Sequence, residues 1–327
     1  MNHALKIVGR IQWLEGLKSG LRTAWGLGII IFPVTLVFSV IRYTPLFDAA
    51  VSGLVPVMEL FGLPGEAAVP LVLGNLLNLY AAIGAMLAMD LTVKQVFILA
   101  LMLSFSHGLP VEGAVCKRIG AGFWKVTGFR IALSLVAGLL VNFLWRGGSD
   151  RASYGLVAPA AVEPEGWIEI VYSAFVAAFT GVLQIAAIVI AVMFVIQILK
   201  DLGALNLFAR ATTPLLKPLG ISSRGSVTMA GGLTFGLAFG AGMILEQARE
   251  KKFSRREITL IALFLSACHA VIEDTLIFIP LGINVLPLLV IRLIAAVALT
   301  AMIAYLWRDL EGENTALQNR LTPPRRV

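Results

Sequence analysis

Charged residues are scarce in this 327-residue sequence: they make up 14% of it, against 58% hydrophobic residues. Soluble domains are about a quarter charged, because their surfaces face water. This chain has too little charge to cover such a surface. Its apolar runs at 23–41, 126–145, 174–199, 258–279 and 285–307 also exceed the roughly 18 residues that cross a bilayer. The scarcity of charge excludes a soluble domain and predicts a polytopic membrane protein.

Cysteine is also rare. Two cysteines, Cys116 and Cys268, do not make a disulfide framework, and no C-x-x-C spacing occurs. The sequence lacks the phosphate-binding pattern G-x-x-x-x-G-K-[ST], the zinc motif H-E-x-x-H and the nucleophile pattern G-x-S-x-G. We therefore expect no enzymatic activity and no cofactor.

Acidic residues are the scarcer charged type, with 19 Asp and Glu against 26 Lys and Arg and a net charge of +7. The basic residues lie in short loops beside the apolar runs, and segment 249–256 alone contains five of them. The positive-inside rule explains this placement better than nucleic-acid binding does. We expect a lipid bilayer around the chain and no nucleic-acid partner.

The sequence contains an internal repeat. A shift of 158 residues aligns Gly62 with Gly220, and after a four-residue insertion the shift becomes 162. The second shift aligns the polar residues Ser104 with Ser266, His107 with His269, Glu112 with Asp274, and Arg130 with Arg292. Of only three histidines, two coincide. The match predicts two copies of one unit.

Equivalent loops of the two copies have opposite charge bias. Segment 90–95 contains one basic residue, whereas its counterpart around 249–256 contains five. The next loop reverses the bias: 116–125 contains three basic residues and 280–284 contains no charge. Equivalent loops would therefore lie on opposite membrane faces. The predicted fold class is an all-α polytopic membrane protein with two inverted-topology repeats.

The same charge pattern predicts the domain organisation. Both termini are basic, which favours a cytoplasmic location for both in a cell inner membrane, and the linker is external because it has more acids than bases. The predicted units are an interfacial amphipathic helix at 1–19, a first repeat at 20–146, an external linker at 147–166, a second repeat at 167–308 and a cytoplasmic tail at 309–327.

One region in each copy is unlike a simple span. Segments 47–89 and 204–245 are apolar, and Pro and Gly interrupt both midway. Paired interruptions at corresponding positions indicate the binding site of a transporter. We expect a re-entrant hairpin in each repeat, besides its spanning helices. The alternative is a pair of kinked helices with small residues for close packing.

The densest polar patches are L-S-F-S-H-G-L-P-V-E-G in the first copy and L-S-A-C-H-A-V-I-E-D-T in the second. His269 and Glu273 are spaced i, i+4, so we expect them on one helical face. In the first copy, Gly108 and Pro110 are expected to break the helix. The candidate substrate-binding residues are Ser104, His107, Glu112, Ser266, His269, Glu273, Asp274, Asn75 and Asn78.

Ionisable groups inside a membrane are costly and usually functional. The functional interpretation is a midplane site where Ser and His bind a polar solute and the carboxylates bind a cation or relay protons. In the structural alternative, Arg130 neutralises Glu112 and Arg292 neutralises Asp274 or Glu273. If a metal binds, its ligands would come from His107, Glu112, His269, Glu273 and Asp274. Asn75 and Asn78 are either solute contacts or interhelical hydrogen-bonding residues.

At these residues the sequence resembles a known family. The pattern G-L-P-G-E-A-A-V-P-L-V-L-G-N and its copy G-I-S-S-R-G-S-V-T-M-A-G-G-L, each followed by S-x-x-H, are similar to the nucleoside-recognition or Gate domain. That domain occurs in spore maturation A and B proteins, ferrous-iron transporters and concentrative nucleoside transporters. The resemblance implies a duplicated scaffold of hairpins and helices with a central site. The resemblance does not identify either a nucleoside or iron as the substrate of this chain.

Three functions remain open. The leading one is transport of a small polar solute, nucleoside-like or otherwise organic, through a midplane site. The second is translocation of a divalent, iron-like metal ion by the His/carboxylate clusters. The third is a non-transporting role beside a membrane partner. A homo-oligomer is compatible with each of them.

Overall fold

The computed structural model describes residues 12–154, 166–203, 207, 219, 221–249 and 253–321. Within these residues all regular secondary structure is helical, apart from one isolated bridge between Thr92 and Arg151. Five helices there are long and apolar enough to cross a membrane: Trp13–Ile41, Val93–Arg118, Phe123–Leu144, Trp167–Leu199 and Val285–Trp307. The prediction of an all-helical polytopic membrane protein is confirmed.

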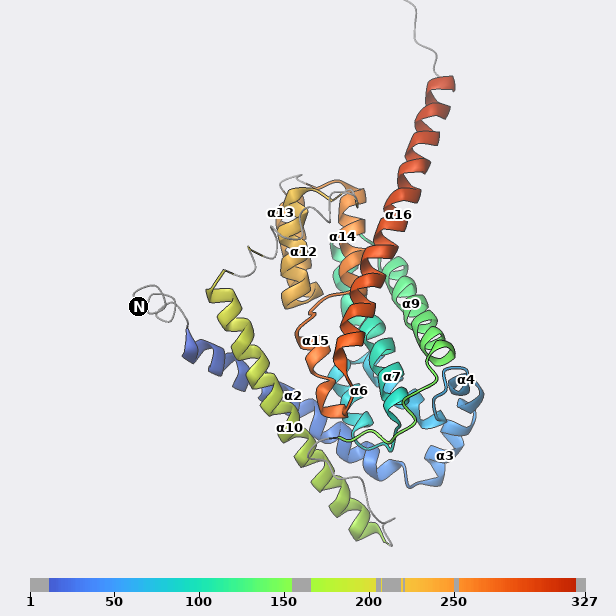
Figure 1. The fold of residues 1–327 in the computed structure, drawn as a ribbon, viewed down its shortest axis with the longest axis vertical. Coiled ribbons are helices and arrows are strands. Elements are labelled where there is room, and N and C mark those ends of the chain that lie inside the picture. The colour runs from blue at the N-terminus through green and yellow to red at the C-terminus, as the bar shows by residue number, and fades with distance from the viewer. Residues whose placement is uncertain are drawn as a thin grey trace, which may run out of the picture.

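Two long helices form one edge of the molecule (Figure 1): α2 (Trp13–Ile41) and α10 (Trp167–Asp201) cross and pack along each other. Glycine permits the close approach, because a Cβ at Gly20 would lie 2.9 Å from Ile190 Cα. Residues 1–11 of the predicted interfacial helix lie outside the described residues. Residues 13–19 are the first turns of α2.

The centre of the molecule is built on α7 (Val93–Ser106), α9 (Phe123–Leu144), α14 (Arg255–Ala267) and α16 (Val285–Leu321). Helix α7 is the most enclosed span, with every residue from Val96 to Ser106 buried. Helix α16 continues to Leu321, so most of the predicted polar tail is helical. Shorter helices border this centre: α3 (Pro45–Ser52), α4 (Val55–Glu59) and a 3-10 turn at Gly65–Ala67.

Each of the two regions that the sequence marks as interrupted contains a pair of short helices, and residues 204–206, 208–218 and 220 of the second region lie outside the described residues. In the first half α5 (Ala68–Leu76) packs on α6 (Leu79–Met86), and in the second α12 (Ser223–Phe235) packs on α13 (Leu237–Arg249). Helices of 8–13 residues are about 12–20 Å long at 1.5 Å per residue. Each is therefore shorter than the roughly 30 Å hydrocarbon core.

The apolar run at 258–279 is not the continuous span that its hydropathy predicts. Helix α14 ends at Ala267, and only a short helix, α15 (Glu273–Leu276), follows. Between them Ala270 has a positive φ of 43°, and its N–H donates to Gly232 O at 3.2 Å. The helix stops because its backbone turns to the carbonyls of α12, which sequence periodicity does not report.

The first half has the expected break at the same position. Helix α7 ends at Ser106, Gly108 has a φ of 58°, and α8 (Leu109–Arg118) begins at the next residue. The N–H of Gly108 donates to Gly74 O at 2.8 Å. Gly74 and Gly232 are themselves equivalent under the 158-residue shift, so the two breaks make matching hydrogen bonds.

Loops that are equivalent in sequence lie at opposite ends of the centre. The start of the linker runs beside the 90–95 loop, where Val93 N–H donates to Asp150 O and Lys94 N–H to Gly148 O, both at 2.9 Å. The same linker segment approaches Gly282, whose added Cβ would lie 2.4 Å from Ser153 O. At the other end of the centre, Cys116, Ile119 and Ala121 share a core with Leu219, Phe253 and Ala304. Residues 155–165 of the linker lie outside the described residues.

Candidate functional site

Each broken helix presents a histidine at its end. His107 is the C-terminal cap of α7, and His269 follows the cap of α14. Their Nδ1 atoms lie 2.8 Å from Leu103 O and 2.7 Å from Leu265 O, one turn back in the same helix. A carbonyl oxygen only accepts, so each Nδ1 carries a hydrogen and donates. In a neutral ring the lone pair is then on Nε2, the atom that faces the centre of the protein.

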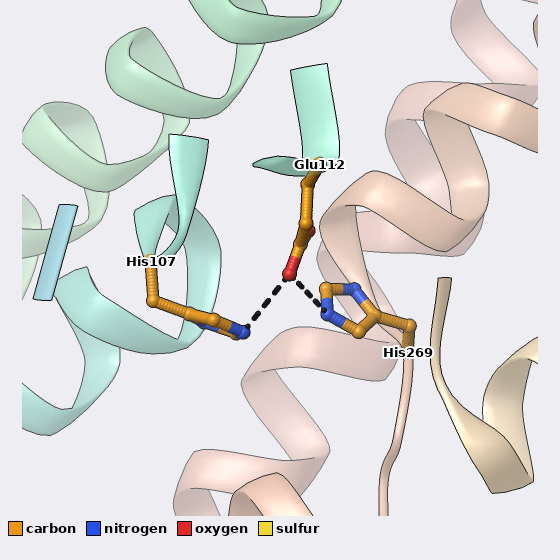
Figure 2. Close-up of side chains that lie close together, drawn as sticks. All are labelled: His107, Glu112 and His269. Atoms are coloured by element: carbon orange, nitrogen blue, oxygen red, sulfur yellow. Dashed lines mark ion pairs between the residues drawn. The ribbon is translucent and has the colours of Figure 1, made fainter. Parts of the chain in front are cut away.

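The two histidines converge on one carboxylate, as Figure 2 shows. Nε2 of His107 and Nε2 of His269 each lie 3.3 Å from the same oxygen, Oε1 of Glu112. The ring centroids lie 5.3 Å apart, and the ring planes are tilted by 47° to each other. Both histidines are buried and Glu112 is only slightly exposed. Residues 162 positions apart in the sequence therefore meet at a single point.

Asp274 is the second acid at this point. Its Oδ2 lies 3.6 Å from His269 Nε2 and 4.0 Å from His107 Nε2. Its backbone N–H donates to Ala270 O, as that of Glu112 does to Gly108 O. The two acids therefore occupy equivalent backbone positions, each four residues after a positive-φ residue.

An arginine from each half pairs with each acid. Arg130 Nη1 of α9 lies 2.7 Å from Glu112 Oε2, and Arg292 Nη2 of α16 lies 3.3 Å from Asp274 Oδ2. Both arginines are fully enclosed. Arg130 Nε also donates to Phe105 O at 2.8 Å, and Arg292 Nη2 donates to His269 O at 2.9 Å. The arginines thus anchor both the acids and the ends of the broken helices. We call His107, Glu112, His269, Asp274, Arg130 and Arg292 the central cluster.

Glu273 is placed differently from the sequence prediction. It was expected on one helical face with His269, but His269 lies in the break and Glu273 begins α15. Its carboxylate accepts a hydrogen bond from the hydroxyl of Tyr80 on α6. The shared-face prediction is wrong, because the backbone leaves the helix between the two residues. Glu273 joins the two halves beside the central cluster.

The predicted serines and asparagines bond mainly to nearby backbone. The hydroxyls of Ser104 and Ser266 donate to Ala100 O at 2.7 Å and to Ala262 O at 2.6 Å, one turn back. Asn78 Oδ1 caps α6 by accepting from Ala81 N–H at 3.0 Å. Asn75 Nδ2 donates to Leu71 O at 2.7 Å, whereas its Oδ1 is buried with no hydrogen-bond partner in the described structure.

Sequence reasoning missed two groups that complete the site. Tyr80 is a lone tyrosine in an apolar helix, and nothing in its surroundings indicates that it faces an acid of the other half. Thr275 accepts from Arg292 Nη1 at 3.3 Å. A search for polar residues next to the predicted acids would have found Thr275, but not Tyr80.

The fold and the cluster define a helical membrane protein with a buried ionisable centre shared by two halves. Comparison with known proteins identifies its family. The family model described as "Nucleoside recognition", named Gate, matches residues 24–130 and 182–284, which is more than half of the chain. The chain belongs to the Gate family, which confirms the resemblance seen in the sequence. Each matched segment contains one histidine and one acid of the central cluster.

A relative in Bacillus subtilis (strain 168) carries the name "Uncharacterized membrane protein YvoD". It is 49% identical to this chain over 296 residues, which cover 90% of this chain and 95% of the relative. The two proteins are therefore similar along nearly their whole length. No solved structure matches the chain.

Proposed function

We propose that this protein is a membrane transporter, and not an enzyme, that moves a small polar solute or ion through the central cluster. One observation carries the proposal: His107 and His269, from the broken helices of the two halves, meet at one carboxylate oxygen. Burying so many ionisable groups in an apolar protein is costly, and such groups usually mark a solute or ion pathway.

The proposal includes an inverted relation between the halves. Matching contacts support it, because Gly108–Gly74 and Ala270–Gly232 are hydrogen-bonded pairs at equivalent positions. So does the placement of the loops: 90–95 lies beside the linker, whereas Phe253 of its counterpart lies in the core at the other end. Inverted repeats with a site at their interface are a common transporter design.

The short helix pairs α5–α6 and α12–α13 are proposed as re-entrant hairpins. Their lengths are too small for a full crossing, and the break of each hairpin lies close to the end of a histidine-bearing helix. Irregular backbone at membrane depth survives where protein or a water-filled path satisfies it. Movement of one hairpin at a time would expose the cluster to one side and then to the other.

A polar organic solute, nucleoside-like in the sense of the family description, is one candidate substrate. Two buried polar atoms favour it: Arg130 Nη2 and Asn75 Oδ1 make no hydrogen bond to the residues described. They offer a donor and an acceptor to a solute. A cation is the other candidate, favoured by the approach of two imidazoles and two carboxylates.

Transport is tested with the full chain in proteoliposomes. Wild type should accumulate at least one member of a panel of nucleosides, small organic acids and divalent cations above empty liposomes. His269→Ala should abolish uptake while the protein stays folded, because Glu112 and Asp274 keep their ion pairs with Arg130 and Arg292. Ala301→Ser, on α16 away from the cluster, is the control and should transport normally. If no solute in the panel crosses, or His269→Ala transports normally, a non-transporting role beside a membrane partner becomes the better explanation.

A further inference from the structure

The contacts at Glu112 are unfavourable unless a positive charge lies among them. Both Nδ1 atoms donate to carbonyls, so in neutral rings both Nε2 atoms present lone pairs. These lone pairs face the Oε1 atom of an ionised carboxylate at 3.3 Å. Each lone pair repels the carboxylate oxygen at this distance. A proton or a metal ion between them reverses the sign of the interaction.

The spacing of these atoms fits a metal ion. Four ligands about 2.0–2.1 Å from a zinc-like ion at the corners of a tetrahedron lie about 3.3 Å from one another. Glu112 Oε1 is 3.3 Å from each Nε2, and Asp274 Oδ2 is 3.6 and 4.0 Å from them. The ligand atoms of His107, Glu112 and His269 all lie within 4.8 Å of one another. Small side-chain movements would close these four atoms around one ion.

The groups behind the ligands are those of a metal site. A metal-bound histidine commonly donates its other ring N–H to a carbonyl or carboxylate, which fixes the ring and its tautomer. Leu103 O and Leu265 O do this for His107 and His269. Arg130 binds Oε2 of Glu112 and leaves Oε1 directed at the histidines. The ligands are therefore oriented in advance.

The types of ligand also favour a transition metal. The site offers the imidazole nitrogens of His107 and His269 beside carboxylate oxygens of Glu112 and Asp274. Imidazole nitrogens select transition metals over Mg²⁺ and Ca²⁺, which prefer oxygen ligands.

We propose that His107 Nε2, His269 Nε2, Glu112 Oε1 and Asp274 Oδ2 bind one divalent transition-metal ion, and that this ion is the transported solute. The inference rests on the proposed transport function and names its substrate class. Each half supplies one imidazole and one carboxylate, so the ion lies where the two halves meet. Separation of the halves on either side would open the coordination shell and release it.

Binding is measured on the purified full chain in detergent after metal removal, with Co²⁺, Zn²⁺, Mn²⁺ and anaerobic Fe²⁺ as probes and Mg²⁺ as the counter-probe. Wild type should bind one transition-metal ion per chain, and Co²⁺ should give the intense visible absorption of tetrahedral coordination. His107→Gln and His269→Gln should each weaken binding by at least about 100-fold, since outer-shell losses alone cost about 10–100-fold. His3→Gln removes the third histidine of the sequence and should bind like wild type.

Zinc X-ray absorption on wild type keeps the test independent of whether the variants fold. Four-coordinate zinc with two imidazoles supports the site, and six-coordinate zinc with oxygen ligands alone overturns it. No metal binding, or equal binding by wild type and both His→Gln variants, also overturns it.

Transport in proteoliposomes separates this inference from the proposed function. Metal uptake that His269→Gln abolishes supports both. Uptake of an organic solute without metal binding overturns the metal site and leaves the transport function standing. Metal binding without any transported solute overturns transport, and with it the role of the ion as cargo.

Discussion

The two helix breaks occupy equivalent positions, yet the acid of the first half makes closer contacts in the central cluster than the acid of the second half. Glu112 is one methylene longer than Asp274. It places one oxygen 3.3 Å from both histidines and the other 2.7 Å from Arg130. Asp274 uses the single atom Oδ2 for both histidines and for Arg292, at 3.3–4.0 Å. Glu112 therefore makes the closer contacts in the central cluster and Asp274 the more distant ones.

The backbones of the two breaks differ as well. The first has glycine at its positive-φ position, and a ten-residue helix resumes at once. The second has Ala270 there, the one non-glycine residue with a positive φ in the described ranges, and only a four-residue helix follows. An L-residue in this conformation is strained, and such strain is often found at functional sites. The backbone is therefore more strained at the second break than at the first.

The largest expected difference concerns the two acids. Glu112→Ala should lower the free energy of unfolding by about 3–5 kcal/mol, because it strands the buried guanidinium of Arg130. Asp274→Ala should cost less, about 1–3 kcal/mol, because Arg292 keeps its hydrogen bonds to His269 O and Thr275 Oγ1. Denaturant titration in detergent measures both. Equal losses would show that Glu112 and Asp274 contribute equally to the free energy of unfolding.

The contact between Tyr80 and Glu273 has no counterpart in the other half, where Val111 occupies the position of Glu273. Tyr80→Phe should cost about 1.5–3 kcal/mol, the range for a hydrogen bond to a charged group. Combining it with Glu273→Ala should cost less than the sum of the two single changes, because each change removes the same hydrogen bond. A double-mutant cycle by thermal unfolding measures this coupling. Strict additivity would show that the two side chains act independently.

Exchanging the residues at the two breaks tests the strain directly. Gly108→Ala should destabilise by about 1–2 kcal/mol through its positive φ, since the nearest atom to an added Cβ is 3.6 Å away and does not clash. Ala270→Gly should stabilise by a similar or smaller amount. Thermal unfolding midpoints of both variants measure the pair. If Ala270→Gly also lowers metal or solute affinity, the strained backbone has a role in binding.

Cysteine substitutions at exposed loop residues disturb the structure least, and they test whether the two repeats have opposite orientations in the membrane. Asp90→Cys and Arg255→Cys place labels on exposed residues of the equivalent loops, in a background where buried Cys116 and Cys268 are alanine. An impermeant thiol reagent should label them from opposite faces of the membrane. Arg151→Cys should react on the same face as Asp90→Cys, because Arg151 Nη1 donates to Asp90 O at 2.8 Å. Labelling of residues 90 and 255 from one face would contradict the inversion.

Sequence reasoning predicted the helical membrane fold because span length and charge scarcity follow from the bilayer itself. It also identified His107, His269 and both arginines. Polar residues are conspicuous in an apolar chain, and it is improbable that several of them match at one sequence shift by chance. It failed at 258–279, where an apolar run of full span length predicts a helix. The break depends on hydrogen bonds from Ala270 and Val271 to α12, a partner far away in the sequence.

The sequence by itself determined the class of protein and the residue types of the centre, and it predicts a duplication, since composition and spacing are properties of the chain alone. Only the tertiary structure decided which acid lies between the histidines and that Glu273 faces Tyr80. It also decided that the serine hydroxyls bond to their own helices. The first two outcomes depend on distances between residues more than a hundred positions apart: His269 from Glu112, and Glu273 from Tyr80. Such distances are set by how the two halves pack, and no local pattern encodes them.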